Sequence, residues 1–272
     1  GAQPDEVCFV RNATEANSVI AAGLALSAGD EVIFETHAHP GGSFPWLNQA
    51  KQRGVTVKVF EPDHTSAEAN LARIRELISP RTKVIQVSHI TCTNGLVMPV
   101  RAIAELATAR GIWFHIDGAQ STGMIPVDLH AIGCDSFALS GHKWIGGPHE
   151  TGALYIRREK LAAVAVTLIG AHAAELPFLP GELKYVSTAG RHEYGTRNAG
   201  LITGLAAADV LVTLKDGTTT VGQVRSHAVT GAWSITPAAL TDGTHRFTAT
   251  ALNDSLETSP SSATLTVKVD TA

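Results

Sequence analysis

The chain has 272 residues, a formal net charge of −4 at pH 7 and 17% charged residues. This length fits one large domain or two modest ones, and the weakly acidic balance argues against a nucleic-acid-binding surface, which needs a basic excess. No apolar run approaches the ~20 residues that a membrane-spanning helix needs. The chain begins at Gly1 without a methionine or a basic-then-apolar leader, which is typical of a fragment or a processed chain and leaves the compartment open.

Strands and helices are predicted to alternate along roughly the first two hundred residues. Short apolar runs without strict polar alternation suit strands that are buried on both faces. Their repeated alternation with helices predicts an α/β fold with a seven-stranded, mostly parallel, doubly wound sheet. The expected strands are 6–10, 32–34, 55–60, 83–87, 112–116, 137–139 and 152–157, and the expected helices are 16–26, 46–53, 66–78, 99–109, 161–166 and 201–208.

The first strand leads into the polar turn at residues 11–15, directly before the first helix. Free backbone N–H groups and the helix dipole make such a turn a binding site for an anion. A simpler alternative is that Asn12 or Thr14 only caps the helix.

Histidines and cysteines give no clear metal site in the sequence. His37 and His39 follow the second strand at i and i+2, a spacing that projects both side chains to one side of an extended segment. No third ligand at a recognisable spacing supports a metal there, so no metal is predicted. Cys8, Cys92 and Cys134 are widely spaced and fit neither a disulfide framework nor a zinc motif, which favours free thiols.

Two later strands end in polar side chains that do not serve packing. The strand at 112–116 is followed by Asp117-Gly118-Ala119-Gln120, and the strand at 137–139 by Ser140-Gly141-His142-Lys143. Ligands of open α/β sheets bind beyond the carboxyl ends of the strands, so the acid and the lysine can share one crevice. They could form a plain ion pair. They could also hold an aldehyde cofactor, because a Schiff-base lysine needs an acid for the pyridine nitrogen, a donor for the phenolic oxygen and hydroxyl groups for the phosphate.

DGAQ followed by SGHKW, each after an apolar strand, resembles the class V aminotransferase family of fold-type I pyridoxal-phosphate (PLP) enzymes. That family includes cysteine desulfurases and isopenicillin N epimerase-like proteins, and the resemblance covers about Val7 to Asp209. It implies PLP as the cofactor and Lys143 as the Schiff-base lysine that moves the Cα proton. It also implies that Asp117 holds the pyridinium proton, His39 stacks on the ring and Gln120 tunes the phenolate. The phosphate would be held by Ala13, Thr14, Ser140 and His142.

The resemblance also implies a homodimer. The segment from Arg191 to Asn198 resembles the part of the family that reaches into the partner subunit's site, where Thr196 would contact the neighbour's phosphate. The alternative is a plain surface turn before the next helix. Cys92 stands where many relatives have an asparagine that helps to hold the cofactor, so that contact is in doubt.

From Val210 the composition becomes rich in threonine and the pattern changes. Short alternating strands with Asp-Gly turns are typical of an antiparallel sandwich. The stretch resembles the bacterial Ig-like repeats of large surface adhesins, without their usual first strand. The predicted domains are therefore a PLP-dependent transferase large domain at 1–209 and an incomplete Ig-like β-sandwich at 210–272, with strands at 211–217, 231–235, 240–251 and 263–270.

These observations predict a PLP-dependent enzyme that acts on the amino group or Cα of an amino acid. The stretch from Thr36 to Trp46 looks nearest to the isopenicillin N epimerase-like branch, and no cysteine is placed like the nucleophile of a desulfurase. The family's small-domain arginine for the substrate carboxylate has no counterpart here, so loss of turnover is expected. The alternatives are a non-catalytic surface or binding protein and an artificial fusion. The PLP part suggests the cytoplasm, whereas the Ig-like part suggests secretion or the cell surface.

Overall fold

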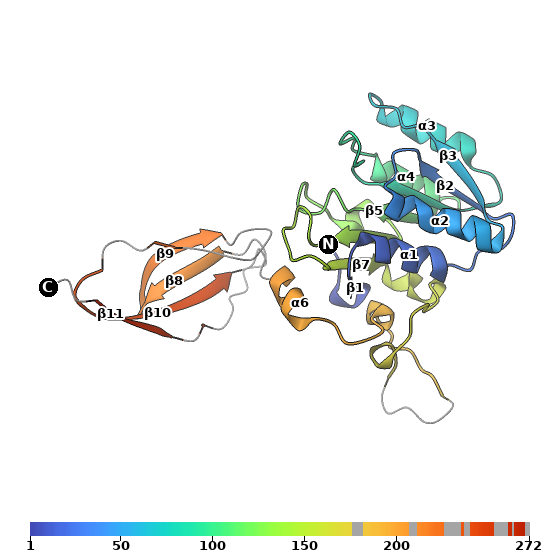
Figure 1. The fold of residues 1–272 in the computed structure, drawn as a ribbon. Coiled ribbons are helices and arrows are strands. Elements are labelled where there is room, and N and C mark those ends of the chain that lie inside the picture. The colour runs from blue at the N-terminus through green and yellow to red at the C-terminus, as the bar shows by residue number, and fades with distance from the viewer. Residues whose placement is uncertain are drawn as a thin grey trace.

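The computed structural model describes residues 1–175, 182–206, 211–225, 235–236, 240–252, 261–262 and 264–269. Figure 1 shows a large α/β part that carries the N-terminus and a small all-β part that carries the C-terminus. The large part is built on a seven-stranded sheet and the small part on a four-stranded one. The predicted fold class is therefore confirmed.

The large sheet has the strand order β1-β7-β6-β5-β4-β2-β3. The five neighbouring strands β6, β5, β4, β2 and β3 are parallel to one another, whereas β7 is antiparallel to both β6 and β1. The carboxyl ends of the parallel strands therefore meet at one edge of the sheet. The strands are β1 (Val7–Val10), β2 (Glu31–Glu35), β3 (Thr56–Phe60), β4 (Thr82–Ser88), β5 (Trp113–Asp117), β6 (Ser136–Ser140) and β7 (Gly152–Ile156).

Helices cover both faces of this sheet, so successive residues of one strand enter different cores. Val32 and Phe34 of β2 pack in the core that contains the first two helices, whereas Ile33 between them packs with the third and fourth helices. This explains why the central strands lack polar alternation. The helices are α1 (Ala13–Gly23), α2 (Pro40–Arg53), α3 (Ala67–Leu77), α4 (Val100–Thr108), α5 (Leu129–Ile132) and α6 (Ala199–Ala206).

Three helices differ from the prediction. The short helix α5 was not predicted. Helix α2 begins at Pro40 and not at residue 46, because His39 caps it and Pro40 occupies the first helical position, where no N–H is needed. The helix predicted at 161–166 is wrong: a 3₁₀-helix spans Arg158–Ala163. The next residue, Val164, is extended and pairs with Leu24 in an isolated bridge, so the helix ends before it.

The C-terminal sheet is antiparallel, with the order β11-β10-β8-β9. Its strands are β8 (Leu211–Asp216), β9 (Thr219–Arg225), β10 (Gly243–Leu252) and β11 (Leu265–Val269). Three of them match predicted strands, and β9 was not predicted. Residues 231–234 of the strand predicted at 231–235 lie outside the described residues. Within the part of the chain that the structure describes, each helix is too short or too polar to cross a membrane.

Glu35 is a buried acid at the carboxyl end of β2. Its side chain is 0% exposed, and its Oε1 accepts a hydrogen bond from the Ser88 N–H at 2.9 Å. Ser88 in turn pairs with Asp117 across β4 and β5. Burial raises the pKa of Glu35 to about 7, and the nearby Asp117 acts in the same direction.

This raised pKa makes stability depend on pH. An unfolded glutamate titrates near ~4.3, so between that pH and about 7 the folded state binds more protons at Glu35 than the unfolded state does. Stability is therefore lost as the pH rises through this window. We expect Glu35→Gln, which keeps an oxygen for the Ser88 N–H, to be more stable than the unmodified chain at pH 8, by up to ~3 kcal/mol, and little different at pH 4.

Urea unfolding of both chains at pH 4, 6 and 8 measures this difference. Glu76→Gln is a matched control, because Glu76 is an exposed side chain on α3. The interpretation is wrong if Glu35→Gln shows the same pH dependence as Glu76→Gln.

Candidate cofactor site

A pocket of about 270 Å³ opens at the carboxyl edge of the large sheet. It collects side chains from α1, from the start of α2 and from the ends of β5 and β6. Seven of the predicted site residues line it together: Ala13, Thr14, His39, Asp117, Ser140, His142 and Lys143. The remaining lining residues are Asn12 and Ala119.

Asp117 is the last residue of β5, and its side chain is held from two sides. Its Oδ1 accepts from the Ala119 N–H at 3.0 Å, and its Oδ2 accepts from the Asn17 amide at 2.9 Å. Gly42 backs the carboxylate so closely that a Cβ there would lie 3.0 Å from Oδ2. Asp117 is 6% exposed, so its position is fixed before any ligand binds.

Asn17 belongs to a buried chain of polar groups that sequence reasoning missed. Its Oδ1 contacts Nε2 of His115 at 2.8 Å, and Nδ1 of His115 contacts the Ser136 hydroxyl at 2.8 Å. The Ser136 oxygen also accepts from the Trp113 indole N–H at 2.9 Å. Asn17, His115 and Ser136 are 0% exposed, so their polar atoms must find hydrogen-bond partners inside the protein.

The hydrogen bonds fix the direction of this chain of groups. The Asn17 amide nitrogen donates to both Gly41 O and Asp117, so its oxygen must accept from His115 Nε2–H. Nδ1 of the neutral imidazole is then an acceptor, and the Ser136 hydroxyl donates to it. Burial lowers the pKa of His115 to about 3, which keeps the ring neutral. No signal in the sequence pairs these residues, because Asn17 and His115 are 98 positions apart.

Pro45 explains why Gly41 can accept from Asn17. A proline inside a helix lacks the N–H that would bond to the carbonyl four residues earlier. In α2 the proline is Pro45, and the carbonyl four residues earlier belongs to Gly41, which accepts instead from Asn17 at 3.1 Å. The proline therefore leaves a backbone acceptor that helps to orient the side chain holding Asp117.

The N-terminus of α1 faces the pocket. Asn12 caps the helix by accepting from the Glu15 N–H at 2.9 Å, which confirms the capping alternative for this residue. The Ala13 N–H donates to the Ser140 hydroxyl at 3.0 Å and ties α1 to the end of β6. Among the described residues, the Thr14 N–H has no protein acceptor, so it can serve an anion together with the helix dipole.

His142 and Lys143 follow β6 in the turn that borders the pocket. Nδ1 of His142 is buried without a hydrogen-bond partner among the described residues. Burial lowers the pKa of His142, and the neighbouring His149 and Lys143 act in the same direction. A buried polar atom without a partner is costly, so this nitrogen is suited to a polar group of a ligand.

His39 and His37 lie in different surroundings, so the prediction that they project to one side is wrong. His39 lines the pocket, and its Nδ1 accepts from the Gly41 N–H at 3.0 Å. His37 sits in a turn and contacts Glu61. The turn at residues 36–37 breaks the extended geometry that the i, i+2 argument assumed.

Two predicted residues do not line this pocket. Gln120 follows β5, and its Oε1 accepts from the Trp144 indole at 2.9 Å, which leaves its amide hydrogens for another acceptor. Thr196 lines a second pocket with Arg11, Glu150 and Arg197. Its predicted contact is with a partner subunit's cofactor, so it stays a prediction.

Cys92 is exposed beyond β4. Of its polar neighbours, Thr91 is buried and donates to Asn94, so the pair bonds internally.

These residues fit PLP. The buried acid at the end of β5 suits a pyridine nitrogen, the lysine after β6 suits the aldehyde, and the unpartnered Thr14 N–H and His142 nitrogen suit a phosphate. An open α/β sheet with this set of residues at its carboxyl edge defines the large domain of a fold-type I PLP enzyme.

Comparison with known proteins gives the family. The Aminotransferase class-V family model matches residues 1–225, so the chain belongs to the class V aminotransferase family, for which PLP is the cofactor. A bacterial Ig-like domain model matches residues 201–271. The two matches overlap, and the boundary predicted after residue 209 stays a prediction.

Similar proteins are mostly cysteine desulfurases. The cysteine desulfurase of Pectobacterium atrosepticum is 34% identical over 76% of this chain and 51% of its own length. The apo structure of a cysteine desulfurase from Thermococcus onnurineus has a TM-score of 0.67 and 29% identity over 76% of this chain and 51% of that one. C-DES, a cystine C–S lyase, has a TM-score of 0.69 and 26% identity over 75% of this chain and 55% of its own. A lysine-to-alanine mutant of C-DES was solved with glycine covalently linked to its PLP cofactor. The chain thus spans about half the length of these relatives.

The buried chain of polar groups predicts a large effect of replacing Asn17. Asn17→Leu keeps the number and branching of the side-chain heavy atoms but leaves Asp117 Oδ2, Gly41 O and His115 Nε2 without partners. Each unsatisfied buried group costs ~1–3 kcal/mol, so we expect a loss of ~3 kcal/mol or more in the free energy of unfolding.

Urea unfolding of the chain measures this loss. Asn48→Leu is the matched control, because Asn48 is exposed on α2 and its replacement is expected to stay within ~0.5 kcal/mol. Equal stabilities of the two variants would contradict the role assigned to Asn17.

Proposed function

We propose that this chain is the cofactor-binding part of a PLP-dependent enzyme that breaks a bond at Cα or Cβ of an amino acid, with Lys143 as the residue that holds PLP covalently. The observation that carries the proposal is the position of Asp117. It is buried, held by Asn17 and the Ala119 N–H, and lines the same pocket as Lys143.

PLP, when bound, supplies an electron sink for the electron pair left at Cα. Asp117 would hold the proton of the pyridine nitrogen, because its two oxygens are already oriented by Asn17 and Ala119. His39, which lines the same pocket, would pack against the ring. The amine of Lys143 would take and return the proton at Cα as a general base and acid.

The phosphate side of the pocket uses groups that lack protein partners. The Thr14 N–H lies at the positive end of α1, and His142 offers a buried nitrogen with no partner among the described residues. Ser140 already accepts from the Ala13 N–H, so its hydroxyl hydrogen is free to point at an anion. These groups favour a dianion in the pocket that Lys143 also lines.

The substrate we propose is a sulfur-containing amino acid of the cysteine or cystine type. The support is the naming of the similar proteins, among them cysteine desulfurases and a cystine C–S lyase. The isopenicillin N epimerase-like reaction, predicted from residues 36–46, stays a second prediction. Of the three cysteines, Cys8 and Cys134 are buried, and burial raises the pKa of both thiols. Cys92 is the exposed thiol of this chain.

A homodimer with shared sites belongs to this proposal. Thr196 lies apart from Lys143 in the same chain, in a pocket that also contains Arg11, Tyr194 and Arg197. Two cationic side chains and a hydroxyl on one surface are suited to a partner's phosphate. The Ig-like part gives the rival proposal, a binding protein whose α/β domain no longer takes a cofactor.

Adding PLP to the purified chain separates these proposals. We expect a yellow absorbance band that borohydride abolishes while it leaves the cofactor covalently attached to the protein, and no such band in Lys143→Ala. Lys51→Ala is the matched control, because Lys51 is exposed on α2. Circular dichroism shows whether each variant is folded. A folded chain without the band, or the same borohydride-sensitive band in Lys143→Ala, overturns the proposal and favours the binding protein.

A further inference from the structure

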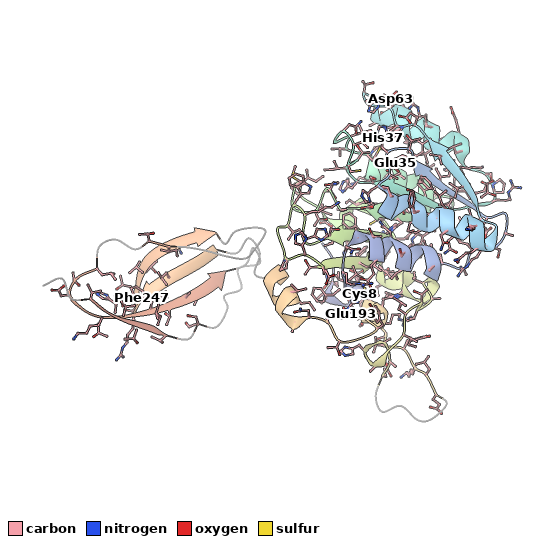
Figure 2. All side chains as sticks on the ribbon, viewed as in Figure 1. Cys8, Glu35, His37, Asp63, Glu193 and Phe247 are labelled. Atoms are coloured by element: carbon pink, nitrogen blue, oxygen red, sulfur yellow. The ribbon has the colours of Figure 1, made fainter. Side chains whose placement is uncertain are left out.

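A second cluster of ligand-type side chains lies outside the cofactor pocket. It consists of His37, Glu61 and His64, and one ligand atom from each lies within 4.8 Å of the other two. His37 follows β2, Glu61 follows β3, and His64 precedes α3. None of the three lines the pocket around Lys143. In Figure 2, His37 lies in the upper part of the domain near Asp63, far from Cys8 and Glu193.

The sheet brings these residues together. β2 and β3 are parallel neighbours, and Glu35 at the end of β2 is in register with Phe60 at the end of β3. The residues that follow the two strands therefore leave the sheet at the same edge. His37 and Glu61 are the side chains that meet there, with 3.2 Å between Nε2 and Oε1.

The third residue is carried by an ordered loop. Asp63 Oδ1 accepts from the backbone N–H groups of Thr65 and Ser66, at 2.9 and 3.0 Å. The buried Asn70 bonds the backbone of Asp63 through both of its side-chain groups, at 2.7 and 2.9 Å. His64 lies inside this loop, so its position is fixed by neighbours that are not themselves ligands.

The distance between His37 and Glu61 is compatible with two ligands of one metal ion. Two ligands bound at ~2.0–2.1 Å with tetrahedral angles lie ~3.3 Å apart, close to the 3.2 Å between His37 and Glu61. The Thr36 hydroxyl donates to the other oxygen of Glu61 and orients the carboxylate.

We propose that His37, Glu61 and His64 bind a divalent transition-metal ion of the Zn²⁺ type. Two imidazoles and one carboxylate are ligands that Zn²⁺ prefers, whereas Ca²⁺ and Mg²⁺ take oxygen ligands. Glu61 and His64 are exposed and His37 is partly exposed, so the site is reachable from solvent. Three protein ligands leave a fourth position for water or another small ligand.

Asn94 contacts His64 and therefore influences how His64 can bind a metal. Its amide nitrogen lies 2.8 Å from Nδ1 of His64, which leaves Nε2 for a metal. A histidine bound through Nε2 carries its proton on Nδ1 and needs an acceptor there. The Asn94 oxygen accepts from the Thr91 hydroxyl, so turning the amide to present oxygen to His64 would give up that bond. Asn94→Asp supplies that acceptor permanently and should strengthen metal binding.

Competition between the full chain and a chromophoric chelator for Zn²⁺ tests the proposal. No PLP is added, because free PLP itself binds metals. Cys92→Ser serves as the common background, since the exposed thiol lies close to the cluster, 4.0 Å from His37 O. In that background we expect one bound Zn²⁺, at least tenfold weaker binding in His64→Ala and in Glu61→Gln, and tighter binding in Asn94→Asp.

The matched control is His172→Ala, because His172 is an exposed histidine outside the cluster and its loss should leave the affinity unchanged. Replacing Zn²⁺ by Co²⁺ gives a second readout, since a tetrahedral site shows strong visible absorption that must vanish in His64→Ala. Circular dichroism confirms that each variant is folded. Absence of Zn²⁺ binding, or equal affinities of His64→Ala and His172→Ala, overturns the proposal. Neither outcome bears on PLP binding, which the Lys143 experiment tests separately.

Discussion

The burial of Asp117 is the constraint on which the site depends. A buried carboxylate is costly unless hydrogen bonds satisfy it, and here the Asn17 amide and the Ala119 N–H do so. Asn17 can present its amide only because the neutral His115 donates to its oxygen, and His115 is held in that form by Ser136. The chemistry proposed for the pocket therefore rests on packing inside the sheet as much as on residues that would touch a ligand.

The carboxyl edge of the sheet accounts for both sites. Parallel strands end at one edge of the sheet, and the polar side chains that follow them gather there, where ligands of open α/β sheets bind. Asp117 and Ser140 terminate β5 and β6 and face the start of α1. The same rule at β2 and β3 places His37 beside Glu61, where the side chains suit a metal ion. One topology thus positions two chemically different clusters without mixing their residues.

Much of the fold could be predicted from the sequence, because strand and helix periodicities are local. The strands of the large sheet were predicted within a few residues, and the polar residues after β5 and β6 indicated the pocket. The prediction failed where the local sequence allowed more than one starting residue for a helix. The second helix was expected to begin at residue 46, whereas His39 caps α2 earlier, and the Gly41 carbonyl that Pro45 leaves without a helical partner accepts from Asn17.

The sequence by itself determined the family and its cofactor, and it predicted the lysine and acid that would serve that cofactor, since these are read from short motifs around Asp117 and Lys143. Only the tertiary structure decided how Asp117 is held and which histidines belong together. Asn17 and Asp117 are 100 residues apart, and His37 meets Glu61 rather than His39. Such pairs follow from strand order and register, which bring distant residues together at an edge that no spacing along the chain reveals.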